Sequence, residues 1–131
     1  MNDRALKRLL EDLDRSLDRL AEALAVPAEE PLAVDGTIQR FEFTFELFWK
    51  AVRRLLARQG IEANSPKAVL QQAYRQGWLD DEERWLDLLK DRNLTSHTYQ
   101  EPLALEIYRR IPAHHRAMRT VYGKLCALLP S

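Results

Sequence analysis

Four polar side chains whose chemistry suits a phosphodiester lie close together in the segment 92–99, which reads RNLTSHTY. They are Arg92, Asn93, His97 and Tyr99. The guanidinium of arginine is always charged and offers forked donors to phosphate, and an imidazole titrates near neutral pH and can move a proton. Because a site that acts on a phosphodiester uses such groups, we expect the chemistry of the chain to lie in this segment.

Each of these side chains has a possible role in RNA cleavage. His97 can take the proton from a 2′-hydroxyl or give one to the leaving oxygen, while Arg92 stabilises the charge that grows on the phosphate. Asn93 can orient the phosphate or His97, and Tyr99 can hydrogen-bond to a base or stack on it. Arg92 and His97 are therefore candidate catalytic residues and Asn93 is a candidate supporting residue, for a reaction that requires no metal and no other cofactor.

The geometry of the segment decides whether these residues share a site. On one regular helix Arg92 and His97 would point about 140° apart. A break after Arg92, which Thr95, Ser96 and Thr98 favour, can bring them together, and so can a second copy across a two-fold axis. Alternatively, the segment is only a capped helix end with Arg92 paired to a carboxylate. The spacing alone leaves these alternatives open.

Hydrophobic residues at helical spacing predict the scaffold. A leucine stripe runs along the first helix at positions 6, 10, 13, 17, 20 and 24, and stops where Pro27, Pro31 and Gly36 interrupt it. Asp35 or Thr37 is expected to cap a second helix, whose aromatic side chains form the core or dimer contacts, and Gly60 is expected to end it. The aromatic residues are Phe41, Phe45, Phe48 and Trp49.

Three further helices are expected after Gly60. Ser65 is a predicted N-cap for a short helix that begins with Pro66, and Asp80 or Asp81 opens the helix that leads to Arg92. A last helix begins near 101–102, and Pro112 is expected to kink or interrupt it. No segment alternates with period two. The prediction is an all-α single domain over 1–131, an antiparallel up-and-down four-helix bundle with one additional short helix.

The composition limits the kinds of partner. The 131 residues carry 20 basic and 20 acidic side chains, so no global field attracts a polyanion and any RNA contact must be local. The single Cys126 excludes an internal disulfide and a multi-cysteine zinc site. The sequence has no signal-peptide pattern and no apolar stretch that predicts a membrane span. We expect a cytoplasmic protein without membrane contact.

Two groups of charged residues are candidates to assist the predicted site. Glu42 and Glu46 lie one helical turn apart and can orient its polar groups, or can pair with nearby cations such as Lys50; we assign Glu46 a supporting role. The last helix carries a possible phosphate-binding strip, which is equally a solvated helix face. Its members are Arg109, Arg110, His114, His115, Arg116 and Arg119.

The string DGTIQRFEFTFELFWKAVRRLL, combined with the pattern RNxxxHxY that starts at Arg92, resembles a known family. The family is that of HEPN proteins once called nucleotidyltransferase substrate-binding proteins and now grouped with HepT-like toxins. The similarity extends over nearly the whole chain.

The resemblance implies a four-helix bundle that dimerises, brings the Arg and His of each copy to the interface and cleaves RNA without metal. By position these residues are Arg92 and His97, with Asn93 as polar neighbour. The family also implies a cognate minimal nucleotidyltransferase that acts as antitoxin in a type VII-style toxin-antitoxin pair. This partner attaches AMP to the motif tyrosine, here Tyr99, and the bulky anion would block RNA. The alternative is a non-catalytic substrate-binding subunit of a two-component nucleotidyltransferase.

Overall fold

A computed structural model describes residues 4–129, and within that range the chain is helical and contains no strand. Its elements are α1 (Arg4–Ala25), α2 (Ala33–Arg58), α3 (Pro66–Arg75), α4 (Glu82–Leu94), the 3₁₀ turn η1 (Thr95–His97) and α5 (Glu101–Ala127). The all-α prediction is therefore confirmed.

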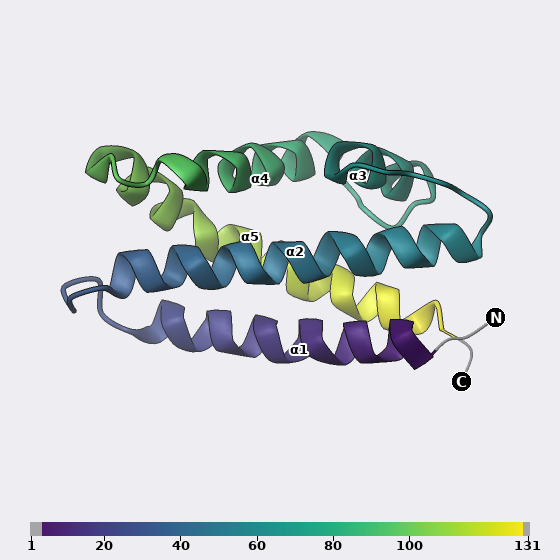
Figure 1. Ribbon diagram of the computed structural model, residues 1–131, viewed down its shortest axis with the longest axis horizontal. Coiled ribbons are helices and arrows are strands. Elements are labelled where there is room, and N and C mark those ends of the chain that lie inside the picture. The colour runs from purple at the N-terminus through teal and green to yellow at the C-terminus, as the bar shows by residue number, and fades with distance from the viewer. Residues whose placement is uncertain (1–3, 130–131) are drawn as a thin grey trace.

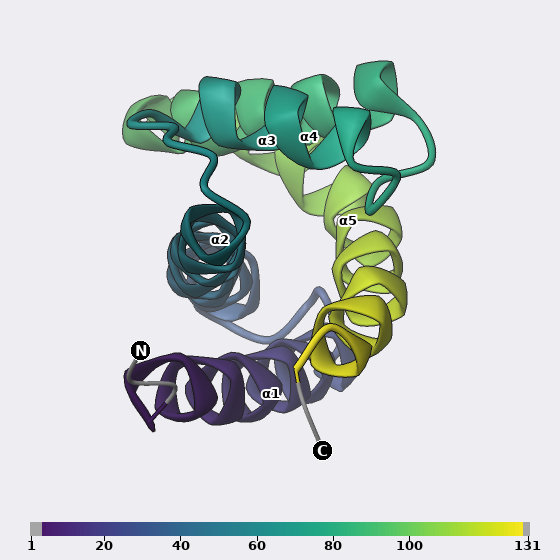
Figure 2. The same cartoon turned by 90° about the vertical axis from the view of Figure 1, so that its right-hand side faces the viewer.

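The helices are arranged around α2. Figure 1 shows α1 and α2 side by side and antiparallel, α3 and α4 along the other side of α2, and α5 crossing obliquely. In the view of Figure 2, α1 lies below α2, α5 lies to its right, and the pair α3 and α4 lies above it. The chain direction alternates along α1, α2, α4 and α5, which agrees with the expected up-and-down order, and α3 is the additional short helix.

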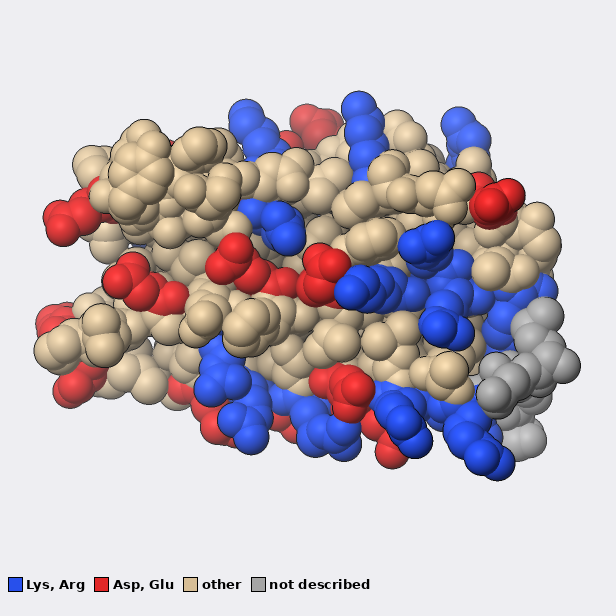
Figure 3. All heavy atoms as spheres, viewed as in Figure 1, with Lys and Arg blue, Asp and Glu red and all other residues tan. Residues whose placement is uncertain are grey.

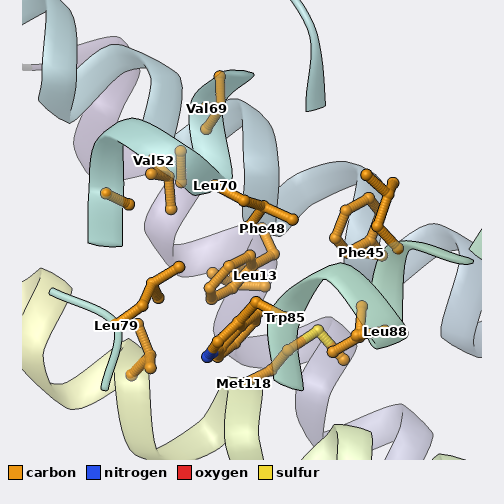
Figure 4. Close-up of a cluster of buried hydrophobic side chains, with 14 of the residues drawn as sticks. Leu13, Phe45, Phe48, Val52, Val69, Leu70, Leu79, Trp85, Leu88 and Met118 are labelled. Atoms are coloured by element: carbon orange, nitrogen blue, oxygen red, sulfur yellow. The ribbon is translucent and has the colours of Figure 1, made fainter. Parts of the chain in front are cut away.

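The core forms where the predicted apolar faces meet. Leu13 and Leu17 of the leucine stripe are fully buried, as are the aromatic rings of α2 at 41, 45 and 48. The ring of Phe48 stacks on Trp85 of α4 with centroids 4.9 Å apart, at the centre of the cluster in Figure 4. This stack connects α2 to the helix that carries the candidate site.

Three predicted helix boundaries are confirmed: the end of α2 and the starts of α3 and α4. Gly60 has a φ of 78°, which glycine adopts without steric cost, and its N–H donates to the carbonyl of Ala57. The Ser65 hydroxyl accepts from the N–H of Ala68 at 3.2 Å, and Asp81 accepts from the N–H of Arg84 at 3.2 Å. These ends depend on local hydrogen bonds, which is why the sequence reveals them.

The predicted start of α2 was wrong. The helix begins at Ala33 after Leu32, which has a φ of 70°, so neither Asp35 nor Thr37 is its cap and Gly36 lies inside it. Asp35 instead lies in the first turn, where a carboxylate is favourable to the helix dipole. Thr37 is buried against α1, so its side chain serves packing.

Of the two effects expected at Pro112, a kink or an interruption, the interruption is absent, because α5 continues through the proline. The proline removes one backbone donor, but Ile107, Ile111 and Met118 are fully buried on either side of it. Their packing keeps the two halves in one helix. Among residues 4–129, no helix has the length and apolar character needed to cross a membrane.

The buried stack gives a test of the fold. Phe48→Ala removes a ring that is fully buried and should lower the free energy of unfolding by about 3–5 kcal/mol. Tyr74→Ala, at a ring that is 43% exposed on α3, should cost about 1 kcal/mol or less. Urea denaturation of both variants measures this, and equal losses would contradict the central position of Phe48.

Candidate functional site

The motif lies where α4 ends. Three hydroxyls bond back to carbonyls one turn earlier: Thr95 to Arg92 at 2.6 Å, Ser96 to Asn93 at 3.2 Å, and Thr98 to Thr95 at 3.1 Å. Carbonyls at a helix end lack intrahelical partners, and these side chains satisfy them while the backbone tightens into the 3₁₀ turn. The predicted break in the helix is present and follows Leu94.

Arg92 points toward α2 and meets Glu46. Its Nη2 lies 3.7 Å from Oε2 of Glu46, and its side chain is 35% exposed. The same oxygen accepts from Nε1 of Trp49 at 3.2 Å, and Oε1 lies 3.4 Å from Nζ of Lys50. Glu46 therefore pairs with two cations, Lys50 on its own helix and Arg92 of the candidate site.

Glu42 contacts the same helix end through Thr95. The Thr95 hydroxyl lies 2.8 Å from Oε2 of Glu42 and 2.6 Å from the Arg92 carbonyl oxygen. A hydroxyl has a single proton, so it donates to one of these acceptors at a time. The two carboxylates of α2 therefore both face the end of α4.

His97 lies on a different side of this helix end. It is exposed and lines an open hollow of about 350 Å³ that also contains Asn93, Lys67 and Lys90. The ring of Tyr99 stands edge-on to His97 with centroids 6.1 Å apart. Tyr99 is 77% exposed and also lines a second hollow, of about 340 Å³, beside the starts of α2 and α5.

The structure thus brings together some of the predicted site residues and not others. Asn93 and His97 share one hollow, and Tyr99 adjoins His97. The hollow that His97 lines does not include Arg92, whose guanidinium instead meets Glu46 of α2. Solvent reaches both side chains. The prediction that Arg92 and His97 meet across a two-fold axis, in a dimer of this chain, stays a prediction.

A buried network behind Arg92 was not predicted. Asp91 is only 4% exposed, and its carboxylate accepts two hydrogen bonds of 2.8 Å from Arg110 and one of 2.7 Å from Nε2 of His114. Nη1 of Arg84 lies 3.0 Å from Nδ1 of His114. Because a guanidinium only donates, Nδ1 accepts from Arg84 and Nε2 donates to Asp91.

The electrostatics follow from this geometry. Burial raises the pKa of the Asp91 carboxyl, but the hydrogen bonds from His114 and Arg110 outweigh it, and the net shift is downward. The bond to Asp91 raises the pKa of Arg110. A signal for the network was present in the sequence: Asp91 follows Trp85 and Leu88 on the buried side of α4, where a charge needs partners.

The possible phosphate-binding strip on α5 is not continuous, because three of its members have partners on other helices. Arg110 is engaged by Asp91, and His114 is buried. Arg119 pairs with Asp14 at 2.6 Å and Asp18 at 2.5 Å on α1. Acidic residues of two different helices, α4 and α1, thus pair with Arg110 and Arg119.

A hollow beside the network has a lining of mixed charge. It has a volume of about 630 Å³ and lies between α4 and α5. Its charged lining residues are Arg84, Lys90, Arg109 and Arg110, opposed by Asp87, Asp91 and Glu106. In residues 4–129, no group of three or more His, Cys, Asp or Glu side chains is placed to hold a metal ion.

Comparison with known proteins identifies the family. Residues 8–127 match the family described as nucleotidyltransferase substrate binding protein like. The chain therefore belongs to this family, within the HepT-like HEPN proteins. It is 35% identical over 83 residues to the probable ribonuclease HepT of Haemophilus influenzae, an alignment that covers 60% of this chain and 57% of that protein. The match thus spans little more than half the length of this curated relative.

Two solved structures have a similar fold. A crystal structure from Thermus thermophilus is 42% identical with a TM-score of 0.81, over 86% of this chain and 98% of that one. A Haemophilus influenzae structure, described as the fold of a substrate binding domain of a nucleotidyltransferase, is 26% identical with a TM-score of 0.66, over 95% and 98%.

The network leads to a prediction about stability and pH. Asp91→Ala leaves Arg110 and His114 without their acceptor and should lower the free energy of unfolding at pH 7 by about 3 kcal/mol. Since the folded pKa of Asp91 is lowered, its contribution is complete above the unfolded pKa of about 3.9 and is lost as the pH falls through the folded value.

Urea denaturation across a pH series measures this loss. The exposed Asp87→Ala, one turn earlier on α4, is the control and should change stability by about 0.5 kcal/mol or less. A deficit in Asp91→Ala that persists unchanged into strong acid would show that the charge of the carboxylate is not its cause.

Proposed function

We propose that this protein is the HepT-like toxin of a type VII-style toxin-antitoxin pair and cleaves RNA without a metal. The observation that carries the proposal is that Arg92, held by Glu46, and the exposed His97 lie at one helix end, in the family's Arg and His positions. Membership of the HepT-like family and the similarity to a probable ribonuclease support it.

The reaction divides between these two side chains. His97 takes the proton of the 2′-hydroxyl, the 2′-oxygen attacks the adjacent phosphorus, and the leaving 5′-oxygen receives a proton. Arg92 donates to the phosphate oxygens as negative charge develops on them. Glu46 orients Arg92 through their contact of 3.7 Å, and Asn93 lies beside His97 in the same hollow.

A homodimer would complete the site. One copy supplies a single His97, whereas the reaction needs both a proton acceptor and a proton donor, and a two-fold axis would supply two. Phe43 on the outer side of α2 is 53% exposed, and Leu47 is half-buried beside it. Such apolar surface next to Glu46 suits contact between copies of the antiparallel bundle.

Tyr99 is the proposed point of control. Its ring is largely exposed and stands edge-on to His97, so AMP attached to its hydroxyl would place a bulky anion beside the proton-transferring group. The proposed donor enzyme is a cognate minimal nucleotidyltransferase, in keeping with the description of the family, and both partners would act in the cytoplasm.

The second candidate function is a non-catalytic substrate-binding subunit of a two-component nucleotidyltransferase. It is favoured by the separation of Arg92 and His97 within one chain and by the description of the Haemophilus influenzae structure. This function requires a stable complex with the nucleotidyltransferase and no RNA turnover.

RNA cleavage in the presence of EDTA distinguishes the two. The wild-type protein should cleave single-stranded RNA with chelator present, and His97→Ala should be slower by about 10² or more because proton transfer is lost. His115→Gln is the matched control, because Nε2 of His115 donates to the carbonyl of Leu17 at 3.0 Å, away from the motif, and cleavage should persist. Intact RNA after incubation with folded, dimeric wild-type protein would exclude the ribonuclease.

Mass spectrometry tests the proposed control. Protein produced with the nucleotidyltransferase and ATP should gain one or more AMP groups at Tyr99 and lose its ribonuclease activity. Tyr99→Phe should gain none, whereas Tyr74→Phe, at another exposed tyrosine, should be modified like the wild type. AMP found only on a third molecule would favour the substrate-binding subunit.

A further inference from the structure

Cationic side chains gather on the C-terminal half of α2. Residues 47–61 contain Lys50, Arg53, Arg54 and Arg58 and no Asp or Glu, and we call these four residues the basic strip. Figure 3 shows Lys and Arg side chains over this half of the helix and Asp and Glu side chains over the other half. A protein without net charge therefore has a local positive surface here.

The members of the strip that lie nearest to the candidate site point outward together. Lys50, Arg53 and Arg54 are exposed, and their positions on the helix fall within about 100° of one another. Arg53 donates to the amide oxygen of Asn64 at 3.3 Å, a neutral partner that leaves its charge uncompensated. The three side chains thus form one ridge along α2.

Helix stability does not account for the whole strip. Cations are favourable in the last turn of a helix because of its dipole, and Arg58 lies in that turn. The other three members precede it. On α5, by contrast, Arg119 is matched by Asp14 and Arg110 by Asp91. An excess of like charge on one ridge points to an anionic partner.

The strip begins at the candidate active site. Lys50 and Arg92 contact the two oxygens of the same carboxylate, at 3.4 Å and 3.7 Å from Glu46. From Glu46 to Arg58 the helix rises by about 18 Å, a length that accommodates several phosphates of a nucleic-acid strand. An RNA strand whose cleaved phosphate contacts Arg92 could therefore continue along the strip.

We infer that the basic strip binds the backbone of the RNA strand that flanks the cleaved phosphate. This inference rests on the proposed ribonuclease function and assigns the RNA a second contact surface, which is independent of base sequence. The strip holds the strand and takes no part in the bond-breaking step. A dinucleotide held at Arg92 and His97 would be too short to gain from it.

Salt-dependent binding tests the inference directly. Anisotropy of a labelled single-stranded RNA is measured against salt concentration with the uncleaving His97→Ala protein, alone and combined with Arg53→Ala and Arg54→Ala. The slope of log affinity against log salt should fall by about 1.4, since each lost phosphate contact on a single strand contributes about 0.7. The same background with Arg8→Ala and Arg19→Ala, two exposed arginines of α1, should retain the full slope.

Cleavage provides the second measurement. In the otherwise wild-type protein, Arg53→Ala with Arg54→Ala should slow cleavage of a long RNA by about tenfold at moderate salt and leave a dinucleotide substrate unaffected. Circular dichroism checks the fold, and the Arg53→Gln and Arg54→Gln pair, which also removes both charges, replaces the alanine pair if that pair unfolds.

The outcomes separate this inference from the proposed function. One outcome is that the wild-type protein cleaves RNA and that the Arg53 and Arg54 double variant keeps the wild-type salt dependence of binding and the wild-type cleavage rate. In that case the strip does not bind RNA and the ribonuclease assignment stands. If the double variant instead loses only its affinity for the nucleotidyltransferase, the strip is a protein-docking surface and the inference is wrong. Wild-type protein that neither binds nor cleaves RNA overturns both.

Discussion

The carboxylate of Asp91 is almost fully buried, and a buried charge has to be compensated by donors. Arg110 and His114 of α5 provide them, and Arg84 of α4 fixes the tautomer of His114 in turn. Because the donors come from α5 and the acceptor from α4, the bonds set the position of one helix relative to the other. Arg92 is the next residue along α4, so the same bonds position the candidate site.

A second constraint comes from the contacts of α4 with α2. Trp85 stacks on Phe48, and further along the helix Arg92 meets Glu46. Helix α4 is thereby held between α2 and α5. Its contact with α2 is apolar near the start of α4 and charged near the end of α4. Hydroxyls in the turn that follows satisfy the last carbonyls, so the chain leaves the helix without unpaired groups at those positions.

The sequence predicts those features that depend on neighbours along the chain. The leucine stripe of α1, the Ser65 cap and the glycine at 60 each follow from local periodicity or local hydrogen bonds, and all three are present. Asp91 was missed because its partners lie 19 and 23 positions away on another helix. Packing also explains why α5 continues through Pro112. For the site, residue types and family resemblance indicated the candidates, whereas the choice of Glu46 as the partner of Arg92 required the tertiary structure.

The charges of α2 have one more physical consequence. Asp35, Glu42 and Glu46 lie toward its beginning and four cations toward its end, on a molecule whose formal charges cancel. A molecule whose positive and negative charges are equal in number but separated in space has an electric dipole moment and no net charge. The field of a polyanion would exert a torque on this dipole. The molecule would then turn its cationic end toward the polyanion before any contact formed.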